Sequence, residues 1–270
     1  MTKKQIIEKI FDRCIKSNNF VFDNNLVKNV IKECNSNTNP YDMTKIDDIS
    51  KLPETVIKDD YCIVHLGSGK HEFIKGISKV YHTFEKIENN ETVDWIYIPS
   101  ILNDFSTSES GILSLANNQR ILHEFLYQDY DVGVVPDEIK MYGSERKRGV
   151  CFEYFVSDKK FKFEKLQIEI DLTLENTGYV TVFEGKNSKP KLWTENFNVY
   201  QLYNPFRYYY DLKEDKKLNI KKLTACYLVR QKNKSNSIIR LYNYTFEKPH
   251  DITSIKLLKK KEYRLKKERV

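Results

Sequence analysis

Asp171, Glu184 and Lys186 are the residues whose types and spacing best suit this chain for a chemical reaction. Asp171 lies in a segment where apolar and polar residues alternate, and Glu184 and Lys186 lie two positions apart in the next hydrophobic segment. Because side chains two apart in a strand point to the same side, the last two share a face. Two carboxylates beside an ammonium group can hold a divalent cation and a water molecule next to a phosphodiester. The pattern therefore predicts hydrolysis of phosphodiester bonds.

The segments that must position these residues are two predicted strands joined by a turn. Within 166–175 the even positions are Leu or Ile and the odd positions are polar or acidic, so one face of this strand is apolar. The turn follows at 176–178. With a loop of two or four residues Asp171 shares a face with Glu184, whereas an unbulged three-residue loop places it on the face of Phe183. The sequence leaves both registers open.

Acid-x-Lys triplets arise by chance in a chain with 45 basic and 38 acidic residues, and this chain contains several. Only Glu184 and Lys186 follow an alternating strand that carries an acid on its polar face, and only their own strand is hydrophobic enough to be buried. A buried Glu or Lys stays charged at low cost only when it is paired or bound to a metal. The alternative to a metal site is a salt bridge at a sheet edge, from Lys186 to Glu184 or Asp171.

The composition is that of a folded chain, large enough for one substantial domain or for a core with a smaller appendage. Of the 270 residues, 40% are hydrophobic and 13% are aromatic, which excludes a disordered protein. The five cysteines form no C-x-x-C pair, which argues against a zinc module or a disulfide framework. There is no signal-peptide pattern and no apolar run long enough to span a bilayer. We expect a cytoplasmic protein without a membrane partner.

Two other kinds of site are not indicated by the sequence. The run Gly67-Ser68-Gly69-Lys70 lacks the spacing of a phosphate-binding loop, so no nucleotide cofactor is expected. The five histidines are dispersed along the chain, and we expect them to be structural or surface residues.

Positive charge is concentrated at the C-terminus. The formal net charge is +7, and residues 254–270 contain eight Lys or Arg against two Glu. We therefore predict a basic tail at 251–270 that attracts polyanions. A solvated helix end or a flexible arm explains the same charges.

The N-terminal residues 1–75 are expected to form a separate helical module. Apolar residues follow helical spacing in 3–16 and again in 24–33, and a hairpin around Gly67-Ser68-Gly69 follows. Helices followed by a hairpin suggest a winged-helix-like module that contacts DNA. A plain packing appendage is the alternative.

A capped helix is predicted before the two central strands. Ser106, with Glu109 three residues later, forms a capping box that opens a helix through about Tyr127. Glu109 therefore has an ordinary role in capping. A carboxylate in such a helix can also reach a nuclease metal site.

The candidate nucleic-acid contacts flank the central strands. Residues 141–149 form a predicted basic loop, in which Arg146, Lys147 and Arg148 could bind phosphates or guanine edges. A helix predicted over 196–210 is rich in aromatic residues for packing, and its polar members Gln201 and Arg207 are candidates to face substrate. Two further strands are predicted over 223–230 and 237–246.

Asp171, a twelve-residue gap and Glu184-Gly185-Lys186, with a capped helix before them and an amphipathic segment after, resemble the PD-(D/E)XK nuclease superfamily. The size of the chain and its helical N-terminus resemble a type II restriction endonuclease. The likeness covers about 106–230. The proline of the motif is missing, since Ile170 precedes Asp171, but that position varies within the superfamily. The run 198–203 also resembles the glutamine-bearing helix of several such nucleases.

This resemblance implies an α/β nuclease domain over 76–250, with a mixed central sheet flanked by helices. It further implies that Asp171 and Glu184 bind Mg²⁺, with the carbonyl of Gly185 as a further ligand, because hard oxygen donors suit this ion. Lys186 would position or help to deprotonate the attacking water. Glu169, on the same face as Asp171, holds a second metal or accepts hydrogen bonds.

The expected function is Mg²⁺-dependent, sequence-specific cleavage of double-stranded DNA by a homodimer, since a two-fold dimer matches a palindromic site. The alternatives are a repair or structure-specific nuclease on the same core, and a DNA-binding protein without catalytic activity whose acids form salt bridges.

Overall fold

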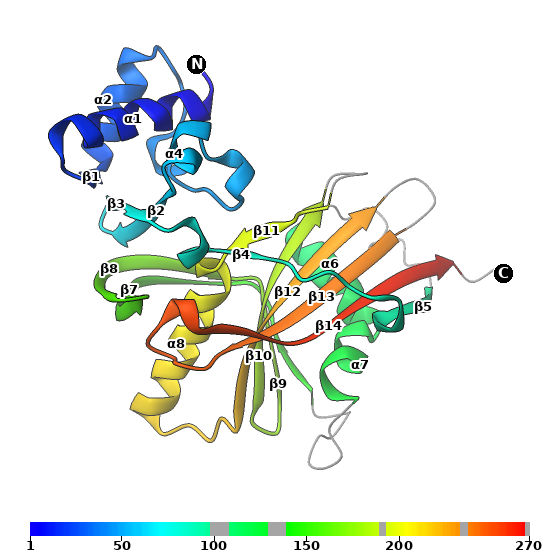
Figure 1. The fold of residues 1–270 in the computed structure, drawn as a ribbon. Helices are drawn as coiled ribbons and strands as arrows, with labels where there is room; N and C mark the ends of the chain where they lie inside the picture. Colours follow the sequence, from blue (N-terminus) through cyan, green and yellow to red (C-terminus); the bar gives the residue numbers. More distant parts are fainter. Residues whose placement is uncertain (98–107, 129–138, 189–192, 233–236, 268–270) are drawn as a thin grey trace.

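The computed structural model describes residues 1–97, 108–128, 139–188, 193–232 and 237–267. In these residues the chain forms a mixed α/β fold with sheets of five, seven and two strands and with helices packed against them (Figure 1). Parallel and antiparallel neighbours occur together in the two larger sheets. The predicted class, α/β with mixed sheet flanked by helices, is therefore confirmed. No helix in the described ranges is both long and apolar enough to cross a membrane.

Helices and a hairpin make up the N-terminal part of the chain. The elements are α1 (Lys3–Ser17), β1 (Val21–Asp23), α2 (Asn24–Glu33), α3 (Pro40–Met43), η1 (Ile49–Lys51), α4 (Glu54–Lys58), β2 (Tyr61–Gly67) and β3 (Lys70–Lys75). α1 begins at a capping box between Thr2 and Gln5, and the carboxylate of Asp23 caps α2. The two helices and the hairpin predicted from the spacing of apolar residues are present.

Two histidines connect the hairpin to the helical segments. Nδ1 of His65 lies 2.8 Å from Nδ1 of His71, so one ring donates to the other. Nε2 of His65 lies 2.9 Å from the carbonyl oxygen of Thr44, and Nε2 of His71 lies 2.9 Å from Oδ1 of Asn24. Burial lowers the pKa of His65 to about 4 and that of His71 to about 3, so both rings are neutral at pH 7. These two histidines have a structural role.

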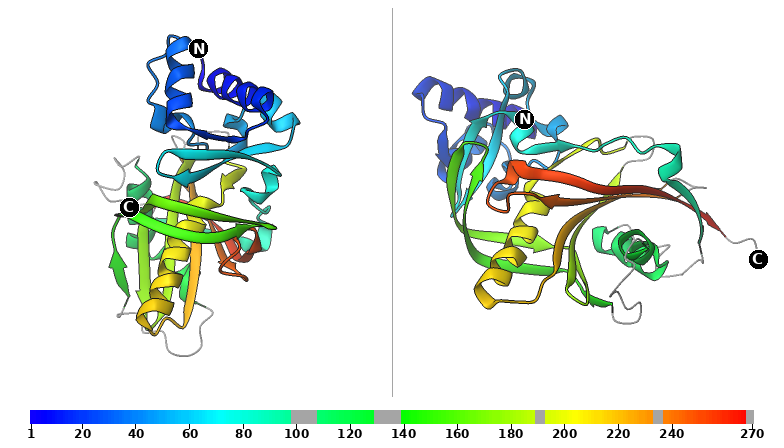
Figure 2. Two further views of the ribbon diagram at one scale, coloured as in Figure 1. Left: turned by 90° about the vertical axis from the view of Figure 1, so that its left-hand side faces the viewer. Right: turned by 60° about the horizontal axis from the view of Figure 1, so that its bottom comes forward.

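The N-terminal hairpin shares its sheet with strands from the second half of the chain. The strand order is β1-β3-β2-β8-β7, in which β7 spans Glu145–Val156 and β8 spans Lys159–Ile170. β2 meets β8 where Gly67 pairs with Glu164. Gly67 has a φ of +84°, and a Cβ there would lie 1.8 Å from the carbonyl oxygen of Glu164. Only glycine fits at this position, where the two parts of the chain meet. Figure 2 shows the N-terminal hairpin (cyan) beside the strands β7 and β8 (green).

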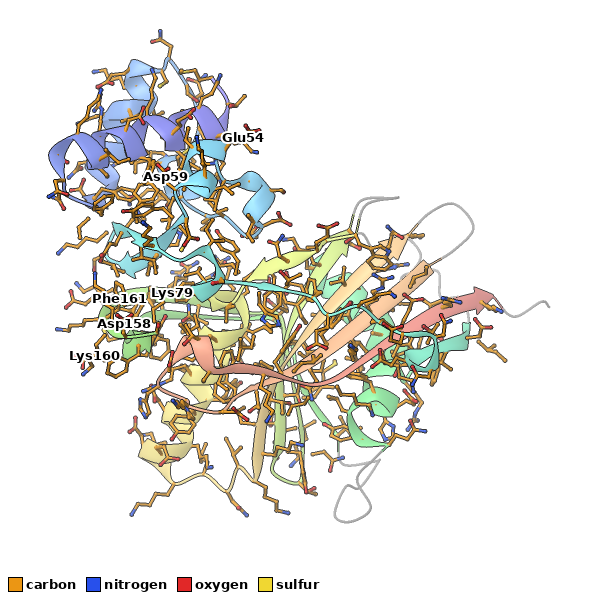
Figure 3. All side chains as sticks on the ribbon, in the orientation of Figure 1. Glu54, Asp59, Lys79, Asp158, Lys160 and Phe161 are labelled. Atoms are coloured by element: carbon orange, nitrogen blue, oxygen red, sulfur yellow. The ribbon has the colours of Figure 1, made fainter. Side chains whose placement is uncertain are left out.

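The segment after the hairpin runs from the five-stranded sheet toward the rest of the chain. Its elements are η2 (Ile77–Lys79) and β4 (Tyr81–Thr83), and β4 pairs with β11 (Asn196–Asn198). Nζ of Lys79 lies 3.8 Å from Oδ1 of Asp158, in the turn between β7 and β8 (Figure 3). An exposed pair of this kind contributes little stability. The β4–β11 pairing is therefore the firmer connection.

The seven-stranded sheet is the centre of the fold. Its strands, in spatial order, are β5 (Thr92–Tyr97), β14 (Ile255–Lys267), β13 (Ser237–Phe246), β12 (Lys222–Lys232), β10 (Tyr179–Ser188), β9 (Leu172–Asn176) and β6 (Lys140–Tyr142). β10 is parallel to β12 and β14 is parallel to β5, and the other neighbours are antiparallel. The parallel pair β10 and β12 is connected through α8 (Tyr200–Lys216). The predicted central hairpin and the two later strands are present.

Helices cover both faces of this sheet. Phe183 of β10 packs in a cluster with residues of α6 (Glu109–Asn118) and α7 (Ile121–Tyr127). Val182, one position earlier, belongs to the other cluster, which contains Leu202 and Phe206 of α8. Alternate residues of one strand therefore face different helices, as the two-residue repeat of a strand requires.

The helices differ in detail from those predicted. Residues 109–127 form two helices, because Arg120 adopts a left-handed φ of 59° between α6 and α7. Ser108 caps α6 by accepting a hydrogen bond from Gly111, and Ser106 lies outside the described residues. The helix predicted over 196–210 begins only at Tyr200, since β11 occupies the residues before it.

Two segments predicted to be loop or tail are strands. Residues 145–148 of the predicted basic loop open β7, and residues 140–142 form β6. The predicted basic tail contains β14, which pairs with β13 on one side and β5 on the other. Tyr263 and Leu265 of this strand are buried, and acids from distant parts of the sequence pair with its lysines, as Glu124 does with Lys261. The tail prediction was therefore wrong for 255–267.

Tyr263 of β14 provides a test of this placement. Its side chain is 0% exposed and its ring contacts Trp95 edge to face. Tyr263→Ala should lower the free energy of unfolding by about 3–5 kcal/mol, as truncation of a buried aromatic residue does. Lys266→Ala, at an exposed position of the same strand, should change it by less than about 0.5 kcal/mol. Urea unfolding measures both, and equal effects would contradict the burial of this strand.

Candidate active site

Asp171 and Glu184 lie on the same side of the central hairpin. Leu172 pairs with Phe183, and the strands are joined by the two-residue turn at Thr177 and Gly178. Both turn residues have positive φ, 47° and 89°, as a tight hairpin turn requires. Asp171 precedes Leu172 and Glu184 follows Phe183, so continuing this register places Asp171 opposite Glu184. Of the loop lengths considered from the sequence, the structure has the two-residue loop, which puts both acids on one face.

The carboxylate of Asp171 is held at a bend between two sheets. The residue separates β8 from β9, so the chain leaves the five-stranded sheet and enters the seven-stranded sheet at this point. The backbone N–H of Gly185 donates a 3.0 Å hydrogen bond to its Oδ2. This bond links the carboxylate directly to the strand that carries Glu184 and Lys186.

Glu184 faces α8 and is oriented by two further residues. Nε2 of Gln201 donates a 2.6 Å hydrogen bond to Oε1 of Glu184. The hydroxyl of Tyr227, which is the partner of Glu184 in the parallel register, donates to Oε1 of Gln201 at 3.4 Å. Gln201 is therefore close to the candidate catalytic residues, but in this structure it orients a carboxylate.

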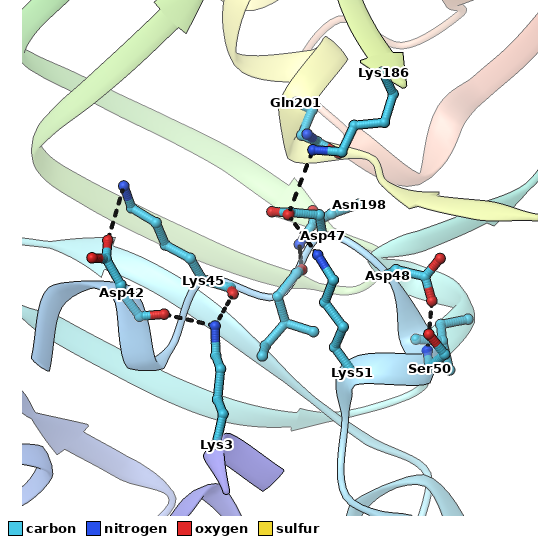
Figure 4. Close-up of polar contacts among 12 residues, drawn as sticks. Lys3, Asp42, Lys45, Asp47, Asp48, Ser50, Lys51, Lys186, Asn198 and Gln201 are labelled. Carbon is cyan, nitrogen blue, oxygen red and sulfur yellow. Dashed lines mark hydrogen bonds and ion pairs between the residues drawn. The ribbon is translucent and has the colours of Figure 1, made fainter. Parts of the chain in front are cut away.

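Lys186 lies between acids of two other segments. Its Nζ lies 2.9 Å from Oε1 of Glu109, the first residue of α6, and the side chain is 27% exposed. The same Nζ lies 3.8 Å from Oδ2 of Asp47 (Figure 4). The ammonium group is therefore half-buried and held in place. These ion pairs do not involve Asp171 or Glu184, so the predicted alternative of a salt bridge within the motif does not explain why those acids are there.

Gly185 allows α6 to approach the site. A Cβ at this position would lie 3.1 Å from the carbonyl oxygen of Glu109 and 3.3 Å from side-chain atoms of Ile112 and Leu113. The absence of a side chain lets the start of α6 pack directly on β10. Glu109 is thereby brought to Lys186, so the helix predicted to supply a carboxylate does supply one at the site.

The two carboxyl groups are in an environment that opposes negative charge. Burial raises the pKa of Glu184 well above its ordinary value, and the charges of Asp171 and Glu109 raise it further. Burial also raises the pKa of Asp171, although its hydrogen bond from Gly185 acts in the other direction. Acids whose pKa is raised by burial and by nearby negative charge are stabilised as anions when a cation binds beside them.

Lys186 is the cation of the site. Burial lowers its pKa, but the hydrogen bond and charge of Glu109 and the charge of Asp47 outweigh this effect and raise the pKa overall. The side chain is therefore an ammonium at neutral pH. It can stabilise negative charge, and it is a poor acceptor of protons in this state.

The donor set suits a hard cation. Within the described ranges, no three acidic, histidine or cysteine side chains are close enough to form a metal site by themselves. Asp171 and Glu184 would supply two oxygen ligands, and Mg²⁺ commonly completes its shell with backbone carbonyls, water and substrate oxygens. The carbonyl of Gly185, the residue between Glu184 and Lys186 in the sequence, is the backbone group predicted for this role. The residues present fit magnesium because they offer carboxylate and carbonyl oxygens.

Glu169 lies outside this cluster. It is exposed on β8, two residues before Asp171, and Arg146 of β7 donates a 2.5 Å hydrogen bond to its Oε1. Of the two roles predicted for Glu169, the structure provides the hydrogen-bond acceptor.

The basic residues predicted to contact DNA are placed differently from one another. Arg146 and Arg148 lie on one face of β7 and are exposed, whereas Lys147 lies on the other face, pairs with Glu145 and lies over the ring of Tyr208. The three therefore do not form one basic loop, because adjacent strand residues point in opposite directions. Arg146 and Arg148 remain accessible to a polyanion.

Arg207 is not available to DNA. It is only 6% exposed, and its guanidinium donates to Asp211 and to the carbonyl oxygen of Pro249. It also lies against the ring of Tyr210. The prediction that Arg207 faces substrate was wrong, because the aromatic packing of α8 buries this side of the helix.

Asp47 was missed by the sequence interpretation. It lies in a polar segment between α3 and η1, far in the sequence from Lys186, and no local spacing marks it. Tyr227 was missed as well, because apolar residues flank it on both sides in its strand and a single hydroxyl matches no spacing motif. Only the packing of distant segments brings these residues to the site.

Glu184→Gln tests the cost of the buried charge. Without divalent cations at neutral pH, the variant should be more stable than the wild type, because a neutral amide avoids the cost of charging the buried carboxylate. Since the folded-state pKa of Glu184 is raised, the gain is full above that pKa and disappears toward its unfolded value of about 4.3. Urea unfolding as a function of pH measures this.

A matched control is Glu153→Gln. Glu153 is exposed on β7, and the hydrogen bond from Lys160 lowers its pKa, so no stabilisation is expected there. A Glu184→Gln protein that is less stable than the wild type at neutral pH would show that Glu184 is already compensated in the metal-free protein.

Comparison with known proteins gives two family matches. Residues 3–73 match the model described as Domain of unknown function (DUF6996), and residues 76–264 match the model described as Domain of unknown function (DUF6997). No curated protein and no solved structure matches the chain. The second model covers more than half of the chain and contains Glu109, Asp171, Glu184 and Lys186. The chain therefore belongs to the DUF6997 family.

Proposed function

We propose that this protein is a Mg²⁺-dependent nuclease that hydrolyses phosphodiester bonds of double-stranded DNA. The observation that carries the proposal is that Asp171 and Lys186 both lie within electrostatic reach of the buried Glu184, while Gly185 and Gln201 donate hydrogen bonds to the two carboxylates. Structural ion pairing does not account for Asp171 and Glu184, whose environment opposes their charge. A divalent cation would remove this unfavourable energy.

The arrangement of elements supports the same proposal. α6 precedes the hairpin β9–β10, and α8 follows it and leads into β12, parallel to β10. Glu109, at the start of α6, and Gln201, in the first turn of α8, both reach the residues of the hairpin. This agrees with the resemblance of the sequence to the PD-(D/E)XK superfamily, in which a sheet flanked by helices carries the motif.

Each residue has a chemical role in this proposal. Bound Mg²⁺ would lower the pKa of a water molecule and offset negative charge in the transition state. Asp171 and Glu184 would hold the ion, and the N–H of Gly185 fixes the carboxylate of Asp171 beside the strand that carries Glu184. Lys186, protonated at neutral pH, orients the water and stabilises charge on the phosphate. Gln201 keeps one oxygen of Glu184 fixed, which leaves the other for the ion.

DNA contacts would come from the exposed basic residues near the site. Arg146 and Arg148 project from β7, and Arg146 contacts Glu169, two residues from Asp171. We propose that these arginines bind phosphates. The N-terminal order of helices followed by the β2–β3 hairpin, with β1 paired to β3, supports the winged-helix-like interpretation and a second contact with DNA.

In its more specific form, the proposal is a type II restriction endonuclease acting as a homodimer on a palindromic site. Digestion of a plasmid of known sequence distinguishes the possibilities. Discrete fragments indicate sequence-specific cleavage, whereas smearing or preference for branched DNA indicates a repair or structure-specific nuclease. Intact plasmid together with a salt-sensitive gel shift indicates a DNA-binding protein without catalysis.

Loss of either metal carboxylate should abolish cleavage. Asp171→Asn and Glu184→Gln should each reduce Mg²⁺-dependent plasmid cutting to background, because uncatalysed phosphodiester hydrolysis is so slow that nucleases need accelerations in the upper part of the ~10⁶–10¹⁷ range. Binding of the same DNA in gel shifts should be largely retained, since phosphate contacts lie elsewhere. Wild-type cutting by either variant would rule out the proposed metal ligands.

Glu164→Gln is the matched control for these variants. Glu164 is an exposed carboxylate on β8, the strand that leads into Asp171, and its own contact is with Lys162. The variant should cut at the wild-type rate. Equal loss of activity in this control would show that removal of any nearby acid disturbs the protein in general.

A further inference from the structure

The segment that carries Asp47 is fixed to the strand before α8. The backbone N–H of Asn198 donates 3.0 Å to the carbonyl oxygen of Asp47, and Nδ2 of Asn198 donates 3.2 Å to the carbonyl oxygen of Ile46. Oδ1 of Asn196 accepts a 2.9 Å hydrogen bond from the N–H of Ile49. The residues on both sides of Asp47 are thus bonded to β11, so its backbone has little freedom.

A second contact buries the same segment. The hydroxyl of Tyr81, in β4, donates 3.0 Å to the carbonyl oxygen of Ile46, and both residues are buried. β4 pairs with β11, so the segment rests on a two-stranded unit that leads directly into α8. Gln201, three residues after Asn198, holds Glu184. Residues 196–201 therefore hold both the segment of Asp47 and the side chain of Glu184.

The side chain of Asp47 lies between two cations. Its Oδ2 is 3.0 Å from Nζ of Lys51 and 3.8 Å from Nζ of Lys186 (Figure 4). The pair with Lys51 spans four residues along the chain and is a local contact. The pair with Lys186 crosses from the N-terminal segment to the strand of the candidate site. Asp47 is 37% exposed, which leaves the contact partly shielded from water.

We propose that Asp47 is a positioning residue for Lys186, so that the N-terminal segment completes the catalytic site. Glu109 holds the ammonium group from α6, and Asp47 holds it from the segment bonded to β11. With two carboxylates on it, the flexible lysine side chain is restricted to one orientation. The N-terminal residues are therefore part of the catalytic machinery in addition to any role in binding DNA. This inference rests on the proposed nuclease function.

The two family matches give the contact a further meaning. Asp47 lies in the range 3–73 and Lys186 lies in the range 76–264, so the ion pair joins residues from the two matched regions. The Gly67–Glu164 junction is close-packed and the Asp47 segment is hydrogen-bonded, so these two regions are held together at two separated places. Correct placement of Lys186 depends on the second of these.

The first experiment is a double-mutant cycle on the rate of DNA cleavage. Asp47→Asn should lower kcat about 10- to 100-fold with KM nearly unchanged, since a small misplacement of a catalytic group costs this much. In a Lys186→Met background, the same substitution should have no further effect, because Asp47 acts through Lys186. Asp47→Glu, which keeps the charge, should recover part of the rate.

Asp42→Asn is the matched control. Asp42 lies in the same N-terminal segment, and its carboxylate pairs with Lys45 at 3.8 Å on the exposed surface (Figure 4). This variant should cut at the wild-type rate. Urea unfolding of each variant checks that the chain is folded before rates are compared.

The second experiment observes Lys186 directly and needs no activity. Reductive ¹³C-methylation labels the lysines, and the signal of Lys186 is assigned by its absence in Lys186→Arg. In Asp47→Asn this signal should move and sharpen toward those of exposed lysines, while Asp42→Asn leaves it unchanged. An unmoved signal would overturn the inference.

The two experiments separate the possible failures. If the wild type does not cut DNA, the proposed function fails, and the methyl signal still decides whether Asp47 holds Lys186. If the wild type cuts and Asp171→Asn does not, but Asp47→Asn has normal kcat, the inference fails alone. Faster cutting by Asp47→Asn would also overturn it, because Asp47 would then restrain Lys186 from its working position.

Discussion

The structure around the site depends on keeping two carboxylates together in a partly buried place. Burial makes the charges of Asp171 and Glu184 costly, and the charges of Asp171 and Glu109 add to this cost at Glu184. Such an arrangement persists only where the backbone fixes both groups. Here the hairpin register sets their side, the Gly185 N–H holds one, and Gln201 holds the other. The packing of both faces of the seven-stranded sheet serves to keep these bonds in place.

Gly185 connects this constraint to the rest of the fold. Its N–H binds Asp171, its missing side chain admits α6, and it separates Glu184 from Lys186 so that both lie on one face. α6 in turn packs its apolar residues on the face of Phe183, while Val182 turns to α8. Gly185 therefore allows the apolar packing of α6 and the polar contacts of the candidate site to occur at the same point of β10.

The N-terminal part is built into the same framework. Its hairpin continues the sheet of β7 and β8, and its polar segment is bonded to β11. Sequence periodicity indicated the helices and the hairpin correctly, but it gave no sign of the contacts that join them to the rest of the chain. The pairing of Gly67 with Glu164 joins residues almost one hundred positions apart, and no local pattern encodes such a contact.

By itself, the sequence determined the features that follow from local periodicity and turn chemistry. The two-residue repeat marked the strands around Asp171 and Glu184, and Gly178 in the turn allowed the left-handed backbone of a two-residue loop. Helical spacing marked α1, α2 and the region of α6 and α7, and composition indicated a folded α/β chain. These properties need only neighbouring residues.

Tertiary structure alone decided which polar groups meet. A strand rich in lysine, β14, looked like a tail because its acidic partners come from distant segments. Arg207 looked available for substrate because its partners are not its neighbours in the sequence. The carbonyl that accepts its hydrogen bond belongs to Pro249, and the ring of Tyr210 lies one turn further along the helix. Asp47 reaches Lys186 only because its segment is hydrogen-bonded to β11, which lies about 150 residues further along the chain. Long-range contacts of single side chains depend on the complete packing, whereas periodicity depends on the local chain.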